Sequence, residues 1–231
     1  MTTEKRISVW VEDAERLADC VLSRAEGGGM LDVGLAARLR EINPVVEAET
    51  TVVSSDGLGS LRQQLEGGSA PLLESRPDLV VLSLAGEVGR FKAGIDPDRV
   101  VDEIRSDLVA CIQLIKERSG ARILVANLST LDPDDPVYAY KDRDSDPFVL
   151  VAHRLNLMLL GVSHDEGISL IDIDRKIAEV GGGISVTAAT RYNDVGCDTI
   201  AGEMVRIIED YGFLDDRPLM DQVGALGGAS E

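Results

Sequence analysis

"RPDLVVLSLAGEV", residues 76–88, contains the most strand-like run of the chain. From position 78 to position 86 the run is almost continuously apolar, which is typical of a strand that is buried on both faces. Such a strand belongs inside a parallel sheet that has helices packed against both sides. The stretch therefore predicts a layered α/β fold. It also places an acidic residue, Glu87, just beyond the strand.

Strand-like and helix-like segments alternate on both sides of this run. Strands are predicted at 7–11, 50–55, 78–86, 121–129 and 168–174, and helices up to residue 40 and at 58–68, 96–120, 148–167 and 198–211. Helices of this length between strands imply parallel pairing through right-handed crossovers, and hence three layers. No internal repeat is visible. We expect one domain over residues 1–215 and a flexible, Gly-rich tail over 216–231.

The composition limits the kinds of partner. The formal net charge is −18 at pH 7, which argues against nucleic acid and favours a neutral or cationic small molecule, or a protein partner. The N-terminus lacks the apolar core of a signal peptide, and no window is long enough for a membrane span. These features predict a cytoplasmic protein with no membrane partner.

The cysteines and the sequence motifs give no sign of a bound group. Cys20, Cys111 and Cys197 are an odd set without paired spacing, which argues against a disulfide framework and against a thiolate zinc site. We expect no cofactor and no resident metal.

Carboxylates gather at the predicted strand ends. In parallel α/β sheets, ligands bind beyond the carboxyl ends of the strands. The residues at these places are Glu12 and Asp13, the segment 56–59, Gly86 and Glu87, the segment 129–135, and the loop 194–197 before the last helix.

Four stretches at these strand ends share an order and spacing with a known family. They are "ISVWVED" (7–13), "SSDGLGS" (54–60), "RPDLVVLSLAGEV" (76–88) and "NDVGCDTIAGEMV" (193–205). Together they resemble the SGNH or GDSL hydrolases, which are flavodoxin-like α/β esterases, lipases and polysaccharide deacetylases. The resemblance covers about residues 5–212. With the alternation, it implies a three-layer flavodoxin-like fold of about five parallel strands in the order 2-1-3-4-5.

The resemblance also assigns catalytic positions, and the chain departs from the family there. In the family the first strand runs into Gly-Asp-Ser, whose Ser is the nucleophile, whereas this chain has Asp13. The family's Asp-x-x-His precedes the last helix. This chain keeps Asp194 and has Cys197 in place of the His. A serine esterase needs a hydroxyl and an imidazole, so serine-dependent esterase activity is not expected.

The positions that would form the oxyanion hole also differ from the family pattern. The resemblance implies that Gly57 or Gly59 supplies the backbone N–H group of an oxyanion hole. The family completes this hole with an Asn side chain after the third strand, where this chain has Glu87. A carboxylate at that position opposes a developing negative charge instead of stabilising it.

If this alignment holds, Asp13, Glu87 and Asp194 converge on one pocket. Clustered carboxylates have three functional outcomes: a general acid or base, a cation site, or a site for an amine-bearing ligand. The alternative is that the cluster has no function: the chain has many acidic residues at its surface, and one or more of these side chains point to solvent. Cys197 is either a reactive thiol or inert packing.

Two further features remain open at this level. The acidic segment 129–147 carries Tyr138 and Tyr140 and is either a lid over the pocket or a solvated excursion. The two histidines, His153 and His164, lie within and at the end of the predicted helix 148–167. We interpret both as structural side chains, partly buried or capping.

Two classes of function follow. The first is an enzyme of SGNH-like fold that acts on or binds an acylated sugar or small biosynthetic intermediate, with carboxylates in place of the Ser–His pair. The second is a non-catalytic descendant that binds a ligand or a partner protein. A true esterase with displaced catalytic residues is the third interpretation.

Overall fold

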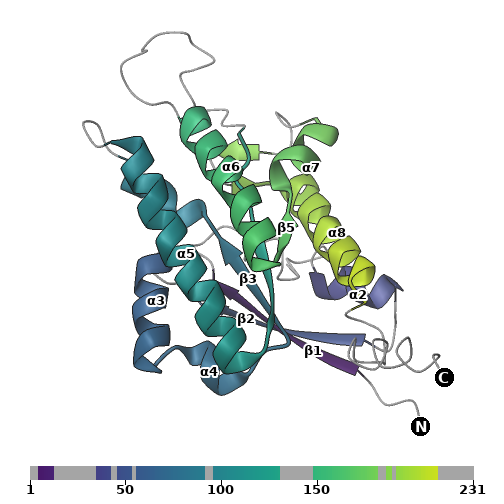
Figure 1. Cartoon of the computed structure of the whole chain (residues 1–231). Coiled ribbons are helices and arrows are strands. Elements are labelled where there is room, and N and C mark those ends of the chain that lie inside the picture. Colours follow the sequence, from purple (N-terminus) through teal and green to yellow (C-terminus); the bar gives the residue numbers. More distant parts are fainter. Residues whose placement is uncertain are drawn as a thin grey trace, which may run out of the picture.

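The computed structural model describes residues 5–12, 35–42, 46–53, 56–91, 96–130, 148–181, 186–188 and 191–212. A five-stranded sheet with the order β2-β1-β3-β4-β5 forms the centre of this part of the chain (Figure 1). Its strands are β1 (Lys5–Glu12), β2 (Val46–Val53), β3 (Leu79–Ser83), β4 (Arg122–Ala126) and β5 (Ser169–Ile171). Every neighbouring pair in the sheet is parallel. The predicted fold and strand order are confirmed.

Helices cover both faces of the sheet and complete the three layers. One face packs against α3 (Leu58–Gly67), α4 (Pro71–Ser75), α5 (Pro97–Ser119) and α6 (Phe148–Glu166). The other packs against α2 (Leu35–Ile42), α7 (Ile173–Glu179) and α8 (Asp194–Asp210). Because side chains alternate along a strand, Val80 and Val81 of β3 enter different cores. All five residues of β3 are buried, as the apolar run predicts.

The long helix α5 shows why its predicted bounds were accurate. The side chain of Asp96 caps its start by accepting a hydrogen bond from the backbone N–H of Asp98 at 3.1 Å, and Pro97 follows at the first helical position. Gly120 ends the helix with φ of 70°, a left-handed conformation that glycine adopts without a Cβ penalty.

Several predicted bounds were wrong. β2 begins at Val46 and not at position 50, and α8 begins at Asp194 and not at position 198. The predicted strand 168–174 is cut short because the Asp172 side chain caps a helix, accepting from the backbone N–H of Arg175 at 3.3 Å.

Short elements were also missed. These are α4, α7 and a hairpin of β6 (Val186–Ala188) and β7 (Arg191–Tyr192). None of the described helices is long and apolar enough to cross a membrane. The predicted tail, 216–231, lies outside the described residues.

Candidate functional site

The best-defined polar site at the carboxyl ends of the strands joins Glu87 to the start of α3. Glu87 lies on a short 3-10 helix, η1 (Ala85–Arg90), that directly follows β3. Its side chain is 2% exposed, and its Oε1 atom accepts a hydrogen bond from the backbone N–H of Leu58 at 2.7 Å. The first N–H groups of a helix have no partner within the helix and carry a partial positive charge. Glu87 therefore acts as an internal anion at this helix terminus.

Arg90 holds the other oxygen of this carboxylate. Arg90 Nη1 lies 3.0 Å from Glu87 Oε2 and 3.1 Å from Asp107 Oδ2 of α5, and Arg90 Nη2 lies 3.1 Å from Glu103 Oε2. Partial burial lowers the pKa of Arg90, but hydrogen bonds to Glu87 and Asp107 outweigh it and raise that pKa above the usual arginine value. The Glu87 carboxylate is thus bound at both oxygens, by a backbone donor and by a cation.

Gly57 is fitted to this arrangement and Gly59 is not. Gly57 precedes α3 with φ of 97°, and a Cβ atom there would lie 2.5 Å from Glu87 Oε1. A Cβ atom on Gly59 would meet nothing closer than Asp107 Oδ2 at 3.5 Å, an ordinary contact. Of the two predicted glycines, Gly57 is therefore the one whose lack of a side chain the site requires.

Asp194 and Cys197 lie in the first turn of α8 and not in a loop before it. The Asn193 side chain caps this helix by accepting a hydrogen bond from the backbone N–H of Gly196 at 3.1 Å. Asp194 is exposed at the first helical position, where a negative charge suits the helix dipole. Cys197 is 6% exposed in the core beneath α8, and its Sγ lies 3.8 Å from the carbonyl oxygen of Tyr192.

The predicted carboxylate cluster stays a hypothesis. Asp13, Tyr138 and Tyr140 lie outside the described residues, so neither the cluster nor the lid is tested. Glu87 contacts α3 directly, and α5 through Arg90, on one face of the sheet, whereas Asp194 starts a helix that packs on the other face. The start of α8 lies at the end of the molecule where the strands finish (Figure 1), and η1 directly follows β3.

A polar network that was not predicted from the sequence lies at the ends of β4 and β5. Asn127 Nδ2 donates to Asp172 Oδ1 at 2.8 Å, and Asn127 Oδ1 accepts from the backbone N–H of Asp174 at 3.2 Å. Asp174 Oδ1 in turn accepts from both the backbone N–H and the hydroxyl of Thr130, each at 2.7 Å. The segments "ANLST" and "DID" carried these residues, but only their pairing across two strands reveals the network.

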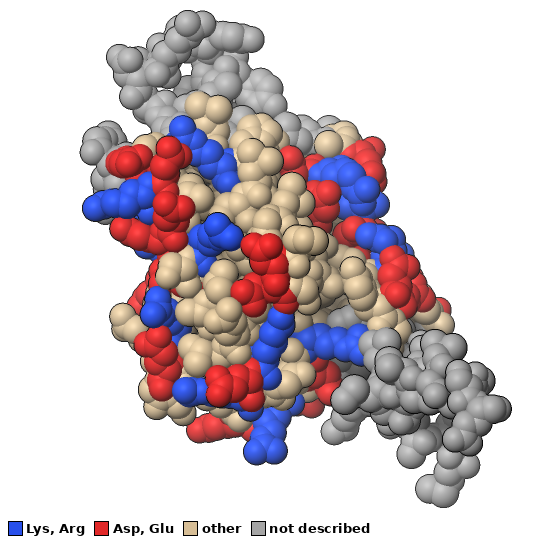
Figure 2. Space-filling view, in the orientation of Figure 1, with Lys and Arg blue, Asp and Glu red and all other residues tan. Residues whose placement is uncertain are grey.

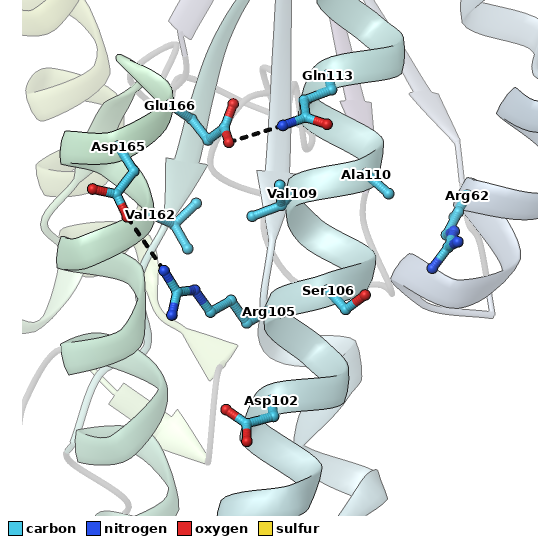
Figure 3. A pocket seen from close by; sticks show the side chains of 10 residues that line it. All are labelled: Arg62, Asp102, Arg105, Ser106, Val109, Ala110, Gln113, Val162, Asp165 and Glu166. Carbon is cyan, nitrogen blue, oxygen red and sulfur yellow. Dashed lines mark hydrogen bonds and ion pairs between the residues drawn. The ribbon is translucent and has the colours of Figure 1, made fainter.

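A surface groove lies away from the strand ends, between α5 and α6 and next to α3. It has a volume of about 480 Å³. Its lining residues are Arg62, Asp102, Arg105, Ser106, Val109, Ala110, Gln113, Val162, Asp165 and Glu166. Arg105 reaches from α5 to Asp165 of α6 at 3.2 Å, and Gln113 donates to Glu166 at 3.0 Å (Figure 3). None of the predicted site residues lines this groove, and Arg105 and Asp165 already form an ion pair across it.

Within the described ranges, no group of three or more His, Cys, Asp or Glu side chains is arranged to hold a metal ion. Glu87, the most buried predicted carboxylate in this part of the chain, is instead bound to Leu58 and Arg90.

Comparison with known proteins supports the fold. No family model matches the sequence, and no curated protein does. Among solved structures, a lipolytic protein of the G-D-S-L family from Veillonella parvula DSM 2008 matches with a TM-score of 0.58 and 13% identity, over 89% of this chain and 98% of that chain. The acetyl xylan esterase AlAXEase matches with a TM-score of 0.59 and 17% identity, over 87% and 100%.

A third match is a catalytic mutant of an acetylxylan esterase from Geobacillus stearothermophilus, with a TM-score of 0.60 and 14% identity, over 89% of this chain and 94% of that chain. At these identities the likeness concerns the fold. The predicted resemblance to SGNH or GDSL hydrolases is thereby confirmed at the level of architecture.

Proposed function

We propose that this protein is a pseudo-hydrolase, which keeps the hydrolase fold but binds its ligand without cleaving it. The observation that carries the proposal is the 2.7 Å hydrogen bond from the Leu58 backbone N–H to Glu87 Oε1. In the family resemblance, a glycine after the second strand and an Asn after the third strand supply the oxyanion hole. The close approach of Gly57 and Glu87 supports this correspondence.

A carboxylate at this position opposes ester cleavage on electrostatic grounds. Two unit charges about 4 Å apart repel by about 4 kcal/mol at an effective dielectric constant of about 20. Loss of a single neutral oxyanion donor already costs about 100-fold to 1,000-fold in rate. Here a carboxylate replaces that neutral donor, and Arg90 offsets its charge only in part. Glu87 Oε1 also lies beside Gly57, one of the two residues to which the resemblance gives the backbone donor. The sequence adds that Asp13 and Cys197 stand where the resemblance places the Ser and His.

The ligand class follows from charge and from the fold. With a formal net charge of −18, the protein attracts neutral or cationic small molecules more readily than anions. Two of the matched solved structures are acetylxylan esterases, so an acetylated xylo-oligosaccharide is the first ligand to test. In this proposal, binding takes place beyond the carboxyl ends of the strands, where Asp13, Asp194 and Tyr138 or Tyr140 are the candidate contacts.

The test separates binding from turnover. Purified protein is incubated with p-nitrophenyl acetate, with acetylated xylo-oligosaccharides and with a fluorophosphonate probe, while calorimetry follows oligosaccharide binding. We expect binding without acetate release, and no probe attached to any serine. Serine-dependent turnover, or a labelled serine peptide, contradicts the loss of hydrolysis. Absence of binding contradicts the ligand class.

Glu87→Asn provides a matched variant, because it restores the family's neutral donor without adding a nucleophile. We expect this variant to remain inactive. Activity in Glu87→Asn alone would show that a working nucleophile exists elsewhere in the chain.

A further inference from the structure

The outward face of α6 is unusually apolar for this chain. The side chains of Leu150, Leu157 and Leu160 are 48%, 69% and 58% exposed. His153, Gly161 and His164 are exposed between and beside them. In a helix these six positions share one side, opposite the buried residues Ala152, Leu155 and Leu159. We call the six residues the α6 face.

Charge is nearly absent from this face although 28% of the residues in the chain are charged. The α6 face holds no Lys, Arg, Asp or Glu. In Figure 2 the surface over α6 is mostly uncharged, while red and blue atoms gather over α5 and α7 on either side. Depletion of charge at an exposed apolar patch is characteristic of the centre of a protein interface.

We propose that the α6 face binds a second copy of this chain, with the two helices antiparallel across a two-fold axis. This inference does not depend on the proposed pseudo-hydrolase function. A self-complementary interface requires that each contact occur twice, with the two residues exchanged between copies.

The leucines provide the first match. With the axis midway between positions 158 and 159, Leu157 of one copy faces Leu160 of the other. The same axis places His153 opposite His164 of the second copy, so the contact has aliphatic side chains at its centre and an imidazole pair at each end.

Charge complementarity provides the second match. Arg154 and Asp165 lie on one flank of α6, eleven positions apart. In an antiparallel pair equivalent flanks face each other, which brings Arg154 of each copy near Asp165 of the other. In a parallel pair opposite flanks would face each other, so Arg154 and Asp165, which share one flank, would not meet. Asp165 already accepts from Arg105 Nη2 at 3.2 Å on the surface, and a carboxylate can accept from a second cation.

The size of the contact sets its strength. The 19 residues of α6 extend about 28 Å at about 1.5 Å per residue. One helix pair of this length buries less than the roughly 1,200 Å² of a standard stable interface. The net charge of −18 on each copy also opposes association. We therefore expect a weak dimer with a Kd on the order of 100 µM, which added salt strengthens by screening the overall repulsion.

Sedimentation equilibrium of the full chain from about 5 µM to about 500 µM, at low and high salt, tests the proposal. We expect the dimer fraction to rise with concentration and with salt. Leu157→Lys introduces two charges at the centre of the contact and should weaken dimerisation at least about tenfold. Because Leu157 is 69% exposed, its thermal unfolding should hardly change. Ile42→Lys on α2, at a side chain 46% exposed, is the matched control and should leave the dimer intact.

The antiparallel register is tested with His153→Cys and His164→Cys, alone and combined. Oxidation should give a covalent dimer only when both are present, because position 153 then faces position 164 of the second copy. A parallel pair would instead cross-link each single variant to its own copy. A monomer at every concentration, or a dimer that Leu157→Lys and Ile42→Lys weaken equally, would overturn the proposal. A monomer that sediments with phosphatidylcholine vesicles would overturn it too, and would assign the α6 face to lipid.

Discussion

Two buried carboxylates, Glu87 and Glu203, lie on opposite faces of the sheet and are neutralised in different ways. They are 2% and 3% exposed. Glu87 is held by one backbone N–H group and one arginine. Glu203, on α8, accepts two hydrogen bonds from Arg206 at 2.7 and 2.9 Å, and also pairs with Lys176 at 3.5 Å and Arg175 at 3.7 Å.

The difference indicates two roles: Glu203 joins two helices, whereas Glu87 occupies a position where a ligand could bind. All described contacts of Glu203 are with side-chain cations of α7 and α8, so this carboxylate fastens one helix to its neighbour. Glu87 occupies a helix N-terminus at the end of the sheet where ligands of this fold class bind. The two carboxylates are equally buried, and the backbone donor, the number of cations and the place in the fold distinguish the two roles.

Gly57→Ala should give the largest effect. The new Cβ would lie 2.5 Å from Glu87 Oε1, and φ of 97° is strained for any L side chain. We expect a loss of about 3 kcal/mol or more in the free energy of unfolding. Gly59→Ala, in the same helix without such a clash, should be neutral or stabilise by up to about 1 kcal/mol. Urea denaturation measures both, and equal stability of the two variants would refute the fit of Gly57 to Glu87.

Removing either carboxylate should show which of the two contributes more to stability. Glu87→Ala leaves the buried Leu58 N–H group without its acceptor and takes one of three carboxylates from Arg90, so we expect a loss of about 2–3 kcal/mol. Glu87→Gln keeps an acceptor for Leu58 and should cost about 1 kcal/mol. Glu203→Ala should cost less than Glu87→Ala, because Arg206 and Arg175 are half-exposed and can be rehydrated. A larger loss for Glu203→Ala in denaturant unfolding would reverse this ranking.

Acidification should weaken the contacts that Glu203 makes with the cations of α7 and α8. Burial alone raises the pKa of Glu203, but hydrogen bonds and charge from Arg206, with the charge of Lys176, hold that pKa below its usual value of 4.5. A lowered folded-state pKa means that the unfolded chain binds more protons as the pH falls through this range. The stability contributed by Glu203 is therefore present above about pH 4.5 and is lost as the pH falls through the folded-state pKa.

Urea unfolding at several pH values between about 3 and 7 measures this contribution. Glu203→Gln should reduce the decline in stability on acidification. Glu209→Gln removes one charge from an exposed position of the same helix and serves as the control. If the free energy of unfolding depends on pH identically in wild type and Glu203→Gln, the contacts of Glu203 are not the acid-sensitive ones.

Local patterns predicted most of the fold because its long elements carry strong signals. The apolar run of β3 and the capped helix α5 needed no tertiary information. The early start of α8 depends on one side-chain cap by Asn193, and α7 depends on Asp172. Asn and Asp occur at helix N-caps and also in loops and at strand ends. The sequence alone does not decide which of these structures the residues adopt.

The candidate site was predicted less completely, for a physical reason. The sequence correctly drew attention to Gly57 and Glu87 as strand-end residues. It could not predict that Glu87 points into the start of α3, because this contact joins residues 29 positions apart across two loops. Nor did any local pattern mark Arg90, whose role depends on Asp107 and Glu103 of another helix.

The smallest effect is expected for Arg175→Ala. Arg175 Nη2 lies 3.7 Å from Glu203 Oε1, beyond hydrogen-bond distance, and its side chain is 55% exposed. Arg206 and Lys176 remain to neutralise the carboxylate, so we expect a loss of at most about 0.5 kcal/mol. Arg90→Ala removes the one described cation on Glu87 and should cost at least about 1 kcal/mol more. Thermal unfolding of both variants measures the difference. A loss in Arg175→Ala equal to that in Arg90→Ala would mean that the three cations around Glu203 do not substitute for one another, and that both carboxylates depend equally on single partners.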